Sequence, residues 1–407
     1  MNVPKLRFKE FNDEWQSINL ADIFQYFGTN SFSREQLSES GILKNLHYGD
    51  IHKKYNSIVN ENDEITSYVK DINYVNKYEL LKNNDLIFAD ASEDYEGIGK
   101  AVEVVNVNNN TISGLHTILA RDNLNVFAPM FKGYYFNSPI VHNQIRVLAN
   151  GFKVYGISKD SINKLNIKVP SINEQSKIAN TLYLLDKKIE LQSKKIEDLK
   201  LFKKGLDQSI FNNKTLFKQE LFKNLFDSDG GTALEKYISK DGTHKIISIG
   251  NYSTNGLYID NGQRITLNDK TKTKLLDKDN LVMILNDKTT SGDIIGSTIL
   301  IDKDNHYIYN QRSQKLICKN IDPKYAWSFL NSNTFRKRIF QLSQGGTQIY
   351  VNFPTIEKET INIPKDENIS NLIINSIFSI YKKIELENNK LDKLQQLKKG
   401  LMQSVFV

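Results

Sequence analysis

The stretch KKIELQSKKIEDLKLFKKGLDQSIF at residues 187–211 returns in altered form as KKIELENNKLDKLQQLKKGLMQSVF at residues 382–406. Both copies begin Lys-Lys-Ile-Glu-Leu and end Lys-Lys-Gly-Leu-x-Gln-Ser-x-Phe, and they lie 195 positions apart without a gap. A segment that recurs at a fixed distance is the sequence sign of a duplicated structural unit. We therefore expect the chain to contain two related halves.

Apolar residues in both copies fall at alternating steps of three and four, which is the a/d pattern of helices that pair along one seam. Neither copy contains proline, and each follows one, Pro170 or Pro364. We predict two long helices that pair with each other, whereas two unrelated amphipathic helices of a larger core are the alternative. The predicted pairing residues are Leu182, Leu185, Ile189, Ile196, Leu199 and Leu206 in the first helix, and Ile377, Ile380, Ile384, Leu391, Leu394 and Leu401 in the second.

The segments that precede the helices also resemble each other. YELLKNNDLIFADA at 78–91 parallels TKLLDKDNLVMILN at 273–286, again 195 positions apart. In a second pair, ANGFKVYGI and QGGTQIYVN, Gly151 aligns with Gly346. Short β-branched runs and helical stretches occur together in both halves, which indicates mixed structure. We therefore predict two related globular domains of the α/β (α+β) class.

One stretch breaks the parallel between the halves. NLHYGDIHKKYNS at 45–57 shows no clear counterpart to GTHKIISIGNYSTNGLY at 242–258. A duplicated scaffold with two different surfaces is typical of two related readers of two different targets. The predicted order is globule 1–172, helix 173–212, globule 213–366 and helix 367–407.

The bulk composition is that of a globular protein. Of the 407 residues, 39% are hydrophobic and 25% are charged, and from the charged opening MNVPKLRFKEF we expect no signal sequence. No apolar run is long enough to cross a bilayer. Cys318 is the only cysteine, which excludes disulfides within the chain and fits the cytoplasm, where we expect the protein. The net charge of +7 favours a polyanionic partner.

The sequence shows few signs of catalysis. It contains no phosphate-binding loop, no dinucleotide-binding glycine motif and no pair of zinc-binding histidines on a helix. His47, Asp50 and His52 stand close together, and they indicate either a metal or catalytic group or a polar surface loop. This absence of motifs favours a binding protein over an enzyme.

Several turns combine basic, amide and aromatic residues, which are the side chains that contact base edges and phosphates. YNQRSQK at 309–315 is the most suggestive, because Asn310, Gln311 and Arg312 follow one another. A solvated turn is the alternative for each stretch. The candidate DNA-contacting residues are His47, Tyr48, Asp50, His52, Lys53, His142, Asn143, Arg146, Ser248, Asn251, Tyr252, Asn310, Gln311, Arg312, Lys315, Arg336 and Arg338.

This layout resembles the specificity subunit of bacterial type I restriction–modification enzymes. The resemblance is carried by the opening PKLRFKEFNDEWQSINLADIF, by the paired helices and by GFKVYGIS…LNIKVPSINEQSKIA at the end of the first globule. It implies two target recognition domains, each reading one half of a split, asymmetric double-stranded DNA sequence. It also implies that the helices pair antiparallel, as a coiled coil, and hold the two domains apart.

The resemblance further implies a scaffold without a catalytic residue, metal or cofactor of its own. Two methyltransferase subunits would dock on it, and restriction (motor) subunits would join. S-adenosylmethionine, ATP and magnesium would belong to those partners, and no membrane would be involved. The alternatives are a stand-alone nuclease or methyltransferase, and a coiled-coil adaptor without a DNA role.

Overall fold

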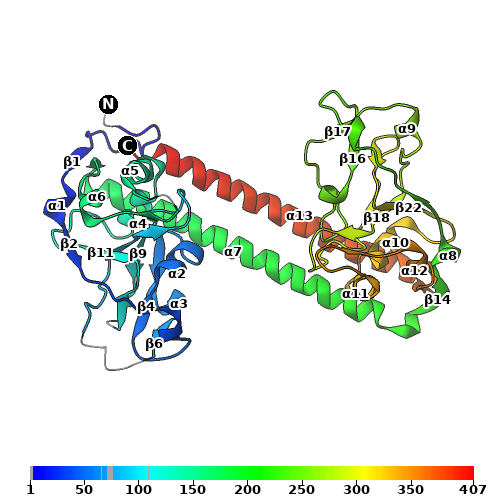
Figure 1. Ribbon diagram of the computed structural model, residues 1–407, viewed down its shortest axis with the longest axis horizontal. Coiled ribbons are helices and arrows are strands. Elements are labelled where there is room, and N and C mark those ends of the chain that lie inside the picture. Colours follow the sequence, from blue (N-terminus) through cyan, green and yellow to red (C-terminus); the bar gives the residue numbers. More distant parts are fainter. Residues whose placement is uncertain (1–2, 66, 71–76, 109, 152) are drawn as a thin grey trace. The chain divides into compact units, whose positions relative to one another are not determined.

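The structure is a computed structural model that describes residues 3–65, 67–70, 77–108, 110–151 and 153–407. The chain forms two compact units (Figure 1). Unit 1 comprises Met1–Ser193 together with Asn389–Val407, and unit 2 comprises Lys194–Asn388. Each long helix therefore contributes residues to both units, whereas the predicted domain boundaries assign each helix to a segment of its own.

Unit 1 is built around a five-stranded sheet with the strand order β2-β11-β7-β9-β5. The central strand β7 (Leu86–Ala89) is buried at every residue, as expected for a strand covered on both faces. Leu86 and Phe88 pack with helix α4 (Phe131–Phe136), whereas Ile87 and Ala89 belong to a second core that includes Ile51 of helix α2 (Tyr48–Lys53). The other strands are β2 (Phe24–Phe27), β11 (Thr117–Asp122), β9 (Ala101–Val105) and β5 (Ile58–Asn60).

A second sheet of unit 1 has the order β10-β4-β6-β3, and two short pairs, β1-β13 and β12-β8, complete the fold. Their bounds are β10 (Thr111–Ser113), β4 (Lys44–Leu46), β6 (Tyr68–Val69), β3 (Leu37–Ser38), β1 (Gln16–Ile18), β13 (Ile167–Val169), β12 (Tyr155–Gly156) and β8 (Ala91–Ser92). The remaining helices are α1 (Leu20–Ile23), η1 (Arg34–Gln36), α3 (Glu61–Glu64), α5 (Pro139–Leu148) and α6 (Lys159–Asn163).

Unit 2 repeats this plan around a four-stranded sheet, β15-β22-β18-β20. Its central strand β18 (Leu281–Ile284) is again fully buried, with Leu281 and Met283 on the side of helix α10 (Pro323–Leu330). Its other strands are β15 (Phe226–Gly230), β22 (Ser313–Cys318), β20 (Thr298–Leu300), β16 (His244–Ile247), β17 (Arg264–Ile265), β21 (Tyr307–Tyr309), β14 (Phe217–Leu221), β24 (Thr360–Pro364), β19 (Asn286–Asp287) and β23 (Ile349–Tyr350). Its remaining helices are η3 (Lys214–Leu216), α8 (Phe222–Leu225), η4 (Glu235–Tyr237), η5 (Ile249–Asn251), α9 (Asp269–Lys272), α11 (Asn333–Leu342) and α12 (Phe353–Ile356).

The stretch predicted to lack a counterpart does have one. Strand β4 pairs parallel with β10 in unit 1, and β16 pairs parallel with β21 in unit 2. The registers set Leu46 opposite Ser113 and Ile247 opposite Tyr309, so the segments that follow β4 and β16 start from corresponding places. The sequence prediction was wrong because strand pairing, and not residue identity, carries the correspondence.

An asparagine at the end of a helix makes the same contacts in both units. In unit 1, Asn137 Nδ2 donates to the carbonyl oxygen of Ala101 at 2.6 Å, and its Oδ1 accepts from the backbone N–H of Ala101 at 3.1 Å. In unit 2, Asn331 bonds the carbonyl oxygen and N–H of Thr298 in the same way, at 2.8 and 3.1 Å. Each asparagine thereby joins the end of a helix to the neighbouring strand of the central sheet.

The glycine alignment predicted from sequence is displaced by one residue. Strand β12 places Gly156 opposite Ala91, and β23 places Tyr350 opposite Asn286, so the two segments correspond with Gly151 on Gly345. Both glycines have positive φ, +133° and +117°, and a Cβ atom at either would meet a backbone oxygen at about 2 Å. Gly346 has no such constraint. The turn therefore requires glycine at Gly345 and not at the predicted position.

The two long helices are confirmed. Helix α7 spans Ile172–Phe211 and α13 spans Glu367–Ser404. Within unit 1, Asp186 near the start of α7 pairs with Lys398 near the end of α13 at 2.6 Å. Within unit 2, Lys195 pairs with Glu387 at 2.9 Å. Higher numbers on one helix thus lie opposite lower numbers on the other, so the pairing is antiparallel, as expected.

The predicted seam is only partly buried. The buried seam residues are Leu182, Leu185, Ile196, Ile377 and Ile384. The half-buried ones are Ile189, Leu199, Leu206, Ile380, Leu391, Leu394 and Leu401. Charged groups also occupy the seam, because Lys203 lies between Asp207, at 3.4 Å, and the ring of Tyr381, at 4.5 Å from its centroid.

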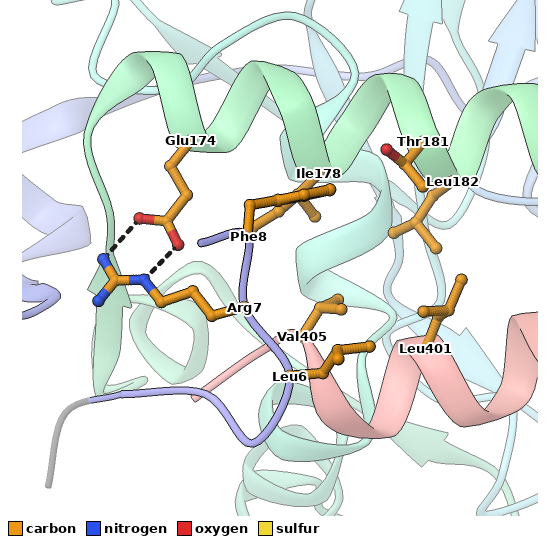
Figure 2. A pocket seen from close by; sticks show the side chains of 9 residues that line it. All are labelled: Leu6, Arg7, Phe8, Glu174, Ile178, Thr181, Leu182, Leu401 and Val405. Carbon is orange, nitrogen blue, oxygen red and sulfur yellow. Dashed lines mark hydrogen bonds and ion pairs between the residues drawn. The ribbon is translucent and has the colours of Figure 1, made fainter. Parts of the chain in front are cut away.

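The N-terminal segment of unit 1 contacts both long helices (Figure 2). The backbone N–H of Leu6 donates to the carbonyl oxygen of Ser404 at 2.9 Å. Arg7 donates two hydrogen bonds to Glu174, at 2.8 and 2.7 Å, near the start of α7. Figure 2 shows an apolar hollow between these segments, lined by Phe8, Val405 and other side chains from the two helices.

Candidate nucleic-acid interface

Three consecutive candidate residues of unit 2 lie in the turn between β21 and β22. Asn310 is buried, with its Oδ1 accepting from the N–H of Leu234 at 2.9 Å and its Nδ2 donating to Glu235 at 3.0 Å. Gln311 is exposed and donates to the same carboxylate oxygen of Glu235 at 2.5 Å. Arg312 is also exposed. Asn310 therefore anchors the turn, while Gln311 and Arg312 are presented to solvent.

A hollow of about 450 Å³ opens beside this turn. Ser248 borders it from the segment that follows β16, together with Asn310, Gln311 and Arg312. The structure thus brings together candidate residues that are more than 60 positions apart in the sequence. Their amide, hydroxyl and guanidinium groups can donate and accept hydrogen bonds at one surface.

Two further candidates of unit 2 lie behind this surface. Asn251 is fully buried and donates from Nδ2 to the carbonyl oxygen of Ile259 at 2.9 Å. Tyr252 is also buried, and its hydroxyl donates to Ser313 Oγ at 2.9 Å. Both side chains are engaged within the unit, and Tyr252 holds the segment after β16 against β22.

Five candidates of unit 1 cluster in the segment after β4, at the start of helix α2 and along it. His47 caps this helix, because its Nδ1 accepts from the backbone N–H of Gly49 at 3.1 Å. Burial lowers the pKa of His47, which keeps the ring neutral near pH 7. Three imidazole rings surround Tyr48: His47, His52 and His116, with ring centroids at 4.7, 6.0 and 5.3 Å.

The remaining candidates on α2 differ in exposure. Asp50 is buried and pairs with Lys54 at 3.1 Å, while Lys53 is exposed. His52 Nε2 lies 2.9 Å from the carbonyl oxygen of Ala91. Of this group, Lys53 and the partly exposed Tyr48 are accessible to a large ligand.

Helices α5 and α11 carry the other candidates, and two of these occupy corresponding positions. His142 Nε2 lies 2.9 Å from the carbonyl oxygen of Ile98. Arg336 donates from Nε to the carbonyl oxygen of Ile295 at 2.7 Å and from Nη2 to that of Asp293 at 2.8 Å. Burial lowers the pKa of His142, and it lowers that of Arg336 to about 10. His142 thus connects α5 to the loop before β9, and Arg336 connects α11 to the loop before β20.

Four candidates lie outside the two turn regions. Asn143 and Arg146 on α5 hydrogen-bond to each other, and Arg146 also pairs with Glu96 at 2.5 Å. Arg338 on α11 donates to the carbonyl oxygen of Thr360 at 3.1 Å. Lys315 is half-buried on β22. The structure does not bring these four to the surfaces around Arg312 and Tyr48, and their contact with DNA stays a prediction.

Sequence reasoning missed several residues at the two surfaces. Lys288, Asn261 and Gln263 border the hollow of unit 2. In unit 1, Arg34 lies 4.0 Å from Asp50, beside α2, and His116 packs on Tyr48. A strand-based alignment of SGLHT with YNQRS would have found His116, whereas the fixed offset of 195 did not.

Exposed leucine and phenylalanine side chains lie beside the seam of the long helices. Their heptad positions are c or g, which adjoin the d residues on one side of a helix. Leu191 and Leu386 hold matching positions in the repeat, and so do Phe202 and Leu397. Each is more than half exposed. Unit 1 thus exposes Leu191 and Leu397, and unit 2 exposes the matching Leu386 and Phe202; each pair is called an apolar patch.

Two kinds of feature are absent from the described part of the chain. No helix there is long and apolar enough to cross a membrane. No group of three or more histidine, cysteine, aspartate or glutamate residues there is arranged to hold a metal ion.

A family model and two curated proteins match the sequence. The model, described as the type I restriction modification DNA specificity domain, matches twice, at residues 12–201 and 219–396. The type I restriction enzyme MjaVIII specificity subunit of Methanocaldococcus jannaschii is 23% identical over 66% of this chain and 67% of that protein. The putative type I restriction enzyme MjaX specificity subunit of the same organism is 25% identical over 54% of this chain and 51% of that protein.

Solved structures share the fold. The S subunit of the type I restriction–modification system from M. genitalium has a TM-score of 0.62 at 14% identity, covering 100% of this chain and 99% of that one. A chain from a study of complex assembly and conformational transition of the type I system has a TM-score of 0.57 at 12% identity, covering 98% and 99%. At these identities the likeness establishes the architecture.

Proposed function

The chain belongs to the family of type I restriction–modification specificity subunits, and on this premise we propose that it is a non-catalytic reader of a two-part, asymmetric DNA sequence. Each unit would read one half-site. One observation carries this proposal: two units whose central strands pair in corresponding registers present different polar side chains at corresponding turns. A common scaffold with unlike reading surfaces fits a target whose halves differ.

The surface of unit 2 has the chemistry that base recognition requires. Arg312 can donate two parallel hydrogen bonds to the O6 and N7 atoms of a guanine, and Gln311 can contact an adenine through its amide. Both side chains are exposed beside the hollow. Exposed Lys288 at this hollow, and Lys53 in unit 1, are suited to phosphates, which position a protein without specifying sequence.

We assign no base contact to four of the predicted residues. Asn251 and Tyr252 are buried, and their polar groups are bonded within unit 2. His142 and Arg336 are bonded to backbone carbonyl oxygens. A residue that loses such a partner on binding DNA would leave a polar group unsatisfied, which costs about 1–3 kcal/mol.

The duplicated apolar patches on the long helices suggest two identical partners. Since Leu191 matches Leu386 and Leu397 matches Phe202, one partner surface can recognise both patches. We assign them to two copies of a methyltransferase subunit. Restriction subunits would join this assembly, and S-adenosylmethionine, ATP and magnesium would be used by these partners.

The decisive experiment replaces one of the two globular domains. The full chain is expressed with its methyltransferase subunit, and the methylated sequence of the host genome is determined. Replacing residues 213–366 by the equivalent domain of a relative should change one half of the methylated sequence and leave the other half unchanged. A change in both halves, or no sequence preference in the parent chain, would refute independent reading.

The number of bound partners tests the scaffold. Leu191→Lys and Leu386→Lys should each reduce the bound methyltransferase from two copies to one, and the double variant should bind none, as measured by sedimentation velocity. Glu190→Lys and Glu385→Lys, which change exposed neighbours, are the matched controls. Two bound copies in the double variant would contradict the assignment of the patches.

A further inference from the structure

Two exposed residues have a backbone conformation that side chains rarely adopt. His116 in unit 1 has φ of 53°, and Arg312 in unit 2 has φ of 67°. Eight non-glycine residues in the described ranges have positive φ, and six of them are asparagine, aspartate or histidine, the types that adopt this region most often. Histidine is thus a common residue type for this conformation, whereas arginine at position 312 is an unusual one.

These two residues hold the same place in the two units. His116 precedes β11, whose first residue, Thr117, pairs with Ala89 of β7. Arg312 precedes β22, whose first residue, Ser313, pairs with Ile284 of β18.

Their backbones are also bonded alike. The carbonyl oxygen of His116 accepts from the N–H of Asp90 at 3.1 Å, and that of Arg312 accepts from the N–H of Leu285 at 2.8 Å. Asp90 and Leu285 each follow the last residue of the central strand. Matched strand register and matched hydrogen bonds therefore equate His116 with Arg312.

The side chain of His116 is held in place but remains accessible. Its Nδ1 lies 3.3 Å from Asp90 Oδ1, and its ring packs edge-on against Tyr48 at 5.3 Å between centroids. About half of the imidazole is nevertheless exposed to solvent. Since Asp90 engages Nδ1, Nε2 is left as the atom that can meet a ligand.

From these observations we propose that His116 is a specificity-determining residue of unit 1, which contacts a base edge at the position equivalent to that of Arg312 in unit 2. Asp90 and Tyr48 act as positioning residues for its imidazole. This inference rests on the proposed function and adds the residue that distinguishes the two half-sites. A single imidazole nitrogen offers one hydrogen bond, whereas a guanidinium offers two parallel ones. The two units would thus read different bases through one common geometry.

The test selects duplexes from a pool with randomised sequence, using the full chain with its methyltransferase subunit. His116→Asn removes the imidazole but keeps a residue that tolerates positive φ. It should lower discrimination at one position of one half-site by about tenfold to a hundredfold, which is the usual range for a lost base contact. Arg312→Asn should do the same in the other half-site. The His116→Arg variant should select guanine at the affected position.

Asn125→Ala is the matched control, because Asn125 is exposed and has φ of 54° elsewhere in unit 1. It should leave both half-sites unchanged. Selection of the parent sequence by both His116→Asn and His116→Arg would overturn the inference, as would a change in the half-site that Arg312→Asn affects. If the parent chain selects no sequence at all, the proposed function itself fails. An intact second half-site in the His116 variants shows that they are folded.

Discussion

The two units agree in the contacts that hold them together and differ in the side chains that they present. Asn137 and Asn331 make matching hydrogen bonds to a strand backbone. At the corresponding turns, unit 1 has the ring of His116, which packs on Tyr48, whereas unit 2 has the long polar side chain of Arg312. Hydrogen bonds to backbone atoms can therefore keep the scaffold alike in both units, because backbone atoms stay the same when the exposed side chains differ.

The largest expected effect tests whether the helix seam is equally buried in both units. Ile384 is 5% exposed in unit 2, whereas the matching Ile189 in unit 1 is only half-buried. Ile384→Asp should lower the free energy of unfolding by about 3–5 kcal/mol, because it buries an unpaired charge. Ile189→Asp should cost clearly less, since water can reach the carboxylate. Urea unfolding measures both, with exposed Leu386→Asp as the control. Equal losses of unfolding free energy in the two variants would show that the seam is equally buried in both units.

The next effect tests the equivalence of the two asparagines. Asn137→Ala and Asn331→Ala should each destabilise their own unit by about 1–3 kcal/mol, because each leaves a strand N–H and carbonyl group without a partner. Hydrogen exchange measured by mass spectrometry should quicken around β9 in the first variant and around β20 in the second. A large effect from one variant and none from the other would break the correspondence.

A smaller effect depends on pH and concerns His142 of unit 1. Burial lowers the pKa of His142 below 6.5, whereas its counterpart Arg336 stays charged. At His142 the unfolded chain therefore binds a proton more readily than the folded chain does. The contribution of the neutral His142 side chain to stability is thus complete above about pH 6.5, and it is lost as the pH falls toward the lower pKa of the folded state. The His142→Gln variant, whose side-chain amide can also reach the Ile98 carbonyl, should lose less stability than the parent between pH 7 and pH 5. Thermal unfolding measures this difference, and identical pH profiles would argue against it.

The smallest effect concerns the exposed lysines. Lys53→Ala and Lys288→Ala should each weaken binding to all DNA sequences about equally and reduce the slope of log affinity against log salt by about 1. Binding titrations at several salt concentrations measure the slope. A change of sequence preference in either variant would instead make that lysine a base contact.

The long helices could be predicted because their signal is periodic and repeated. A seam at steps of three and four, free of proline, specified both helices to within a few residues of α7 and α13. Partial exposure at Ile189 and Leu394 could not be predicted, because the heptad pattern says which side faces a partner and not how closely the partner packs.

The two candidate surfaces around Arg312 and Tyr48 were predicted only in part. The stretch YNQRSQK was identified because it combines amide and basic side chains, which can contact DNA bases. The structure places Asn310, Gln311 and Arg312 around one hollow. His116 was missed because its equivalence to Arg312 lies in strand register, with no shared residue type. Arg336 was selected for its charge, although backbone carbonyl groups already engage it. Residue type shows what a side chain can bind, and only the fold shows what it already binds.

The interleaved make-up of unit 1 has a consequence for biosynthesis. Phe406 packs on Phe131 and Tyr135, at 5.9 and 5.3 Å between ring centroids, and belongs to the main core of this unit. Unit 2 is a continuous piece of chain, but unit 1 needs residues that leave the ribosome after all of unit 2. At typical translation rates, roughly 200 intervening residues delay the completion of this core by about 10–40 s. The part of the molecule that is made first is therefore expected to finish folding last, and until then the side chains that pack on Phe406 stay uncovered.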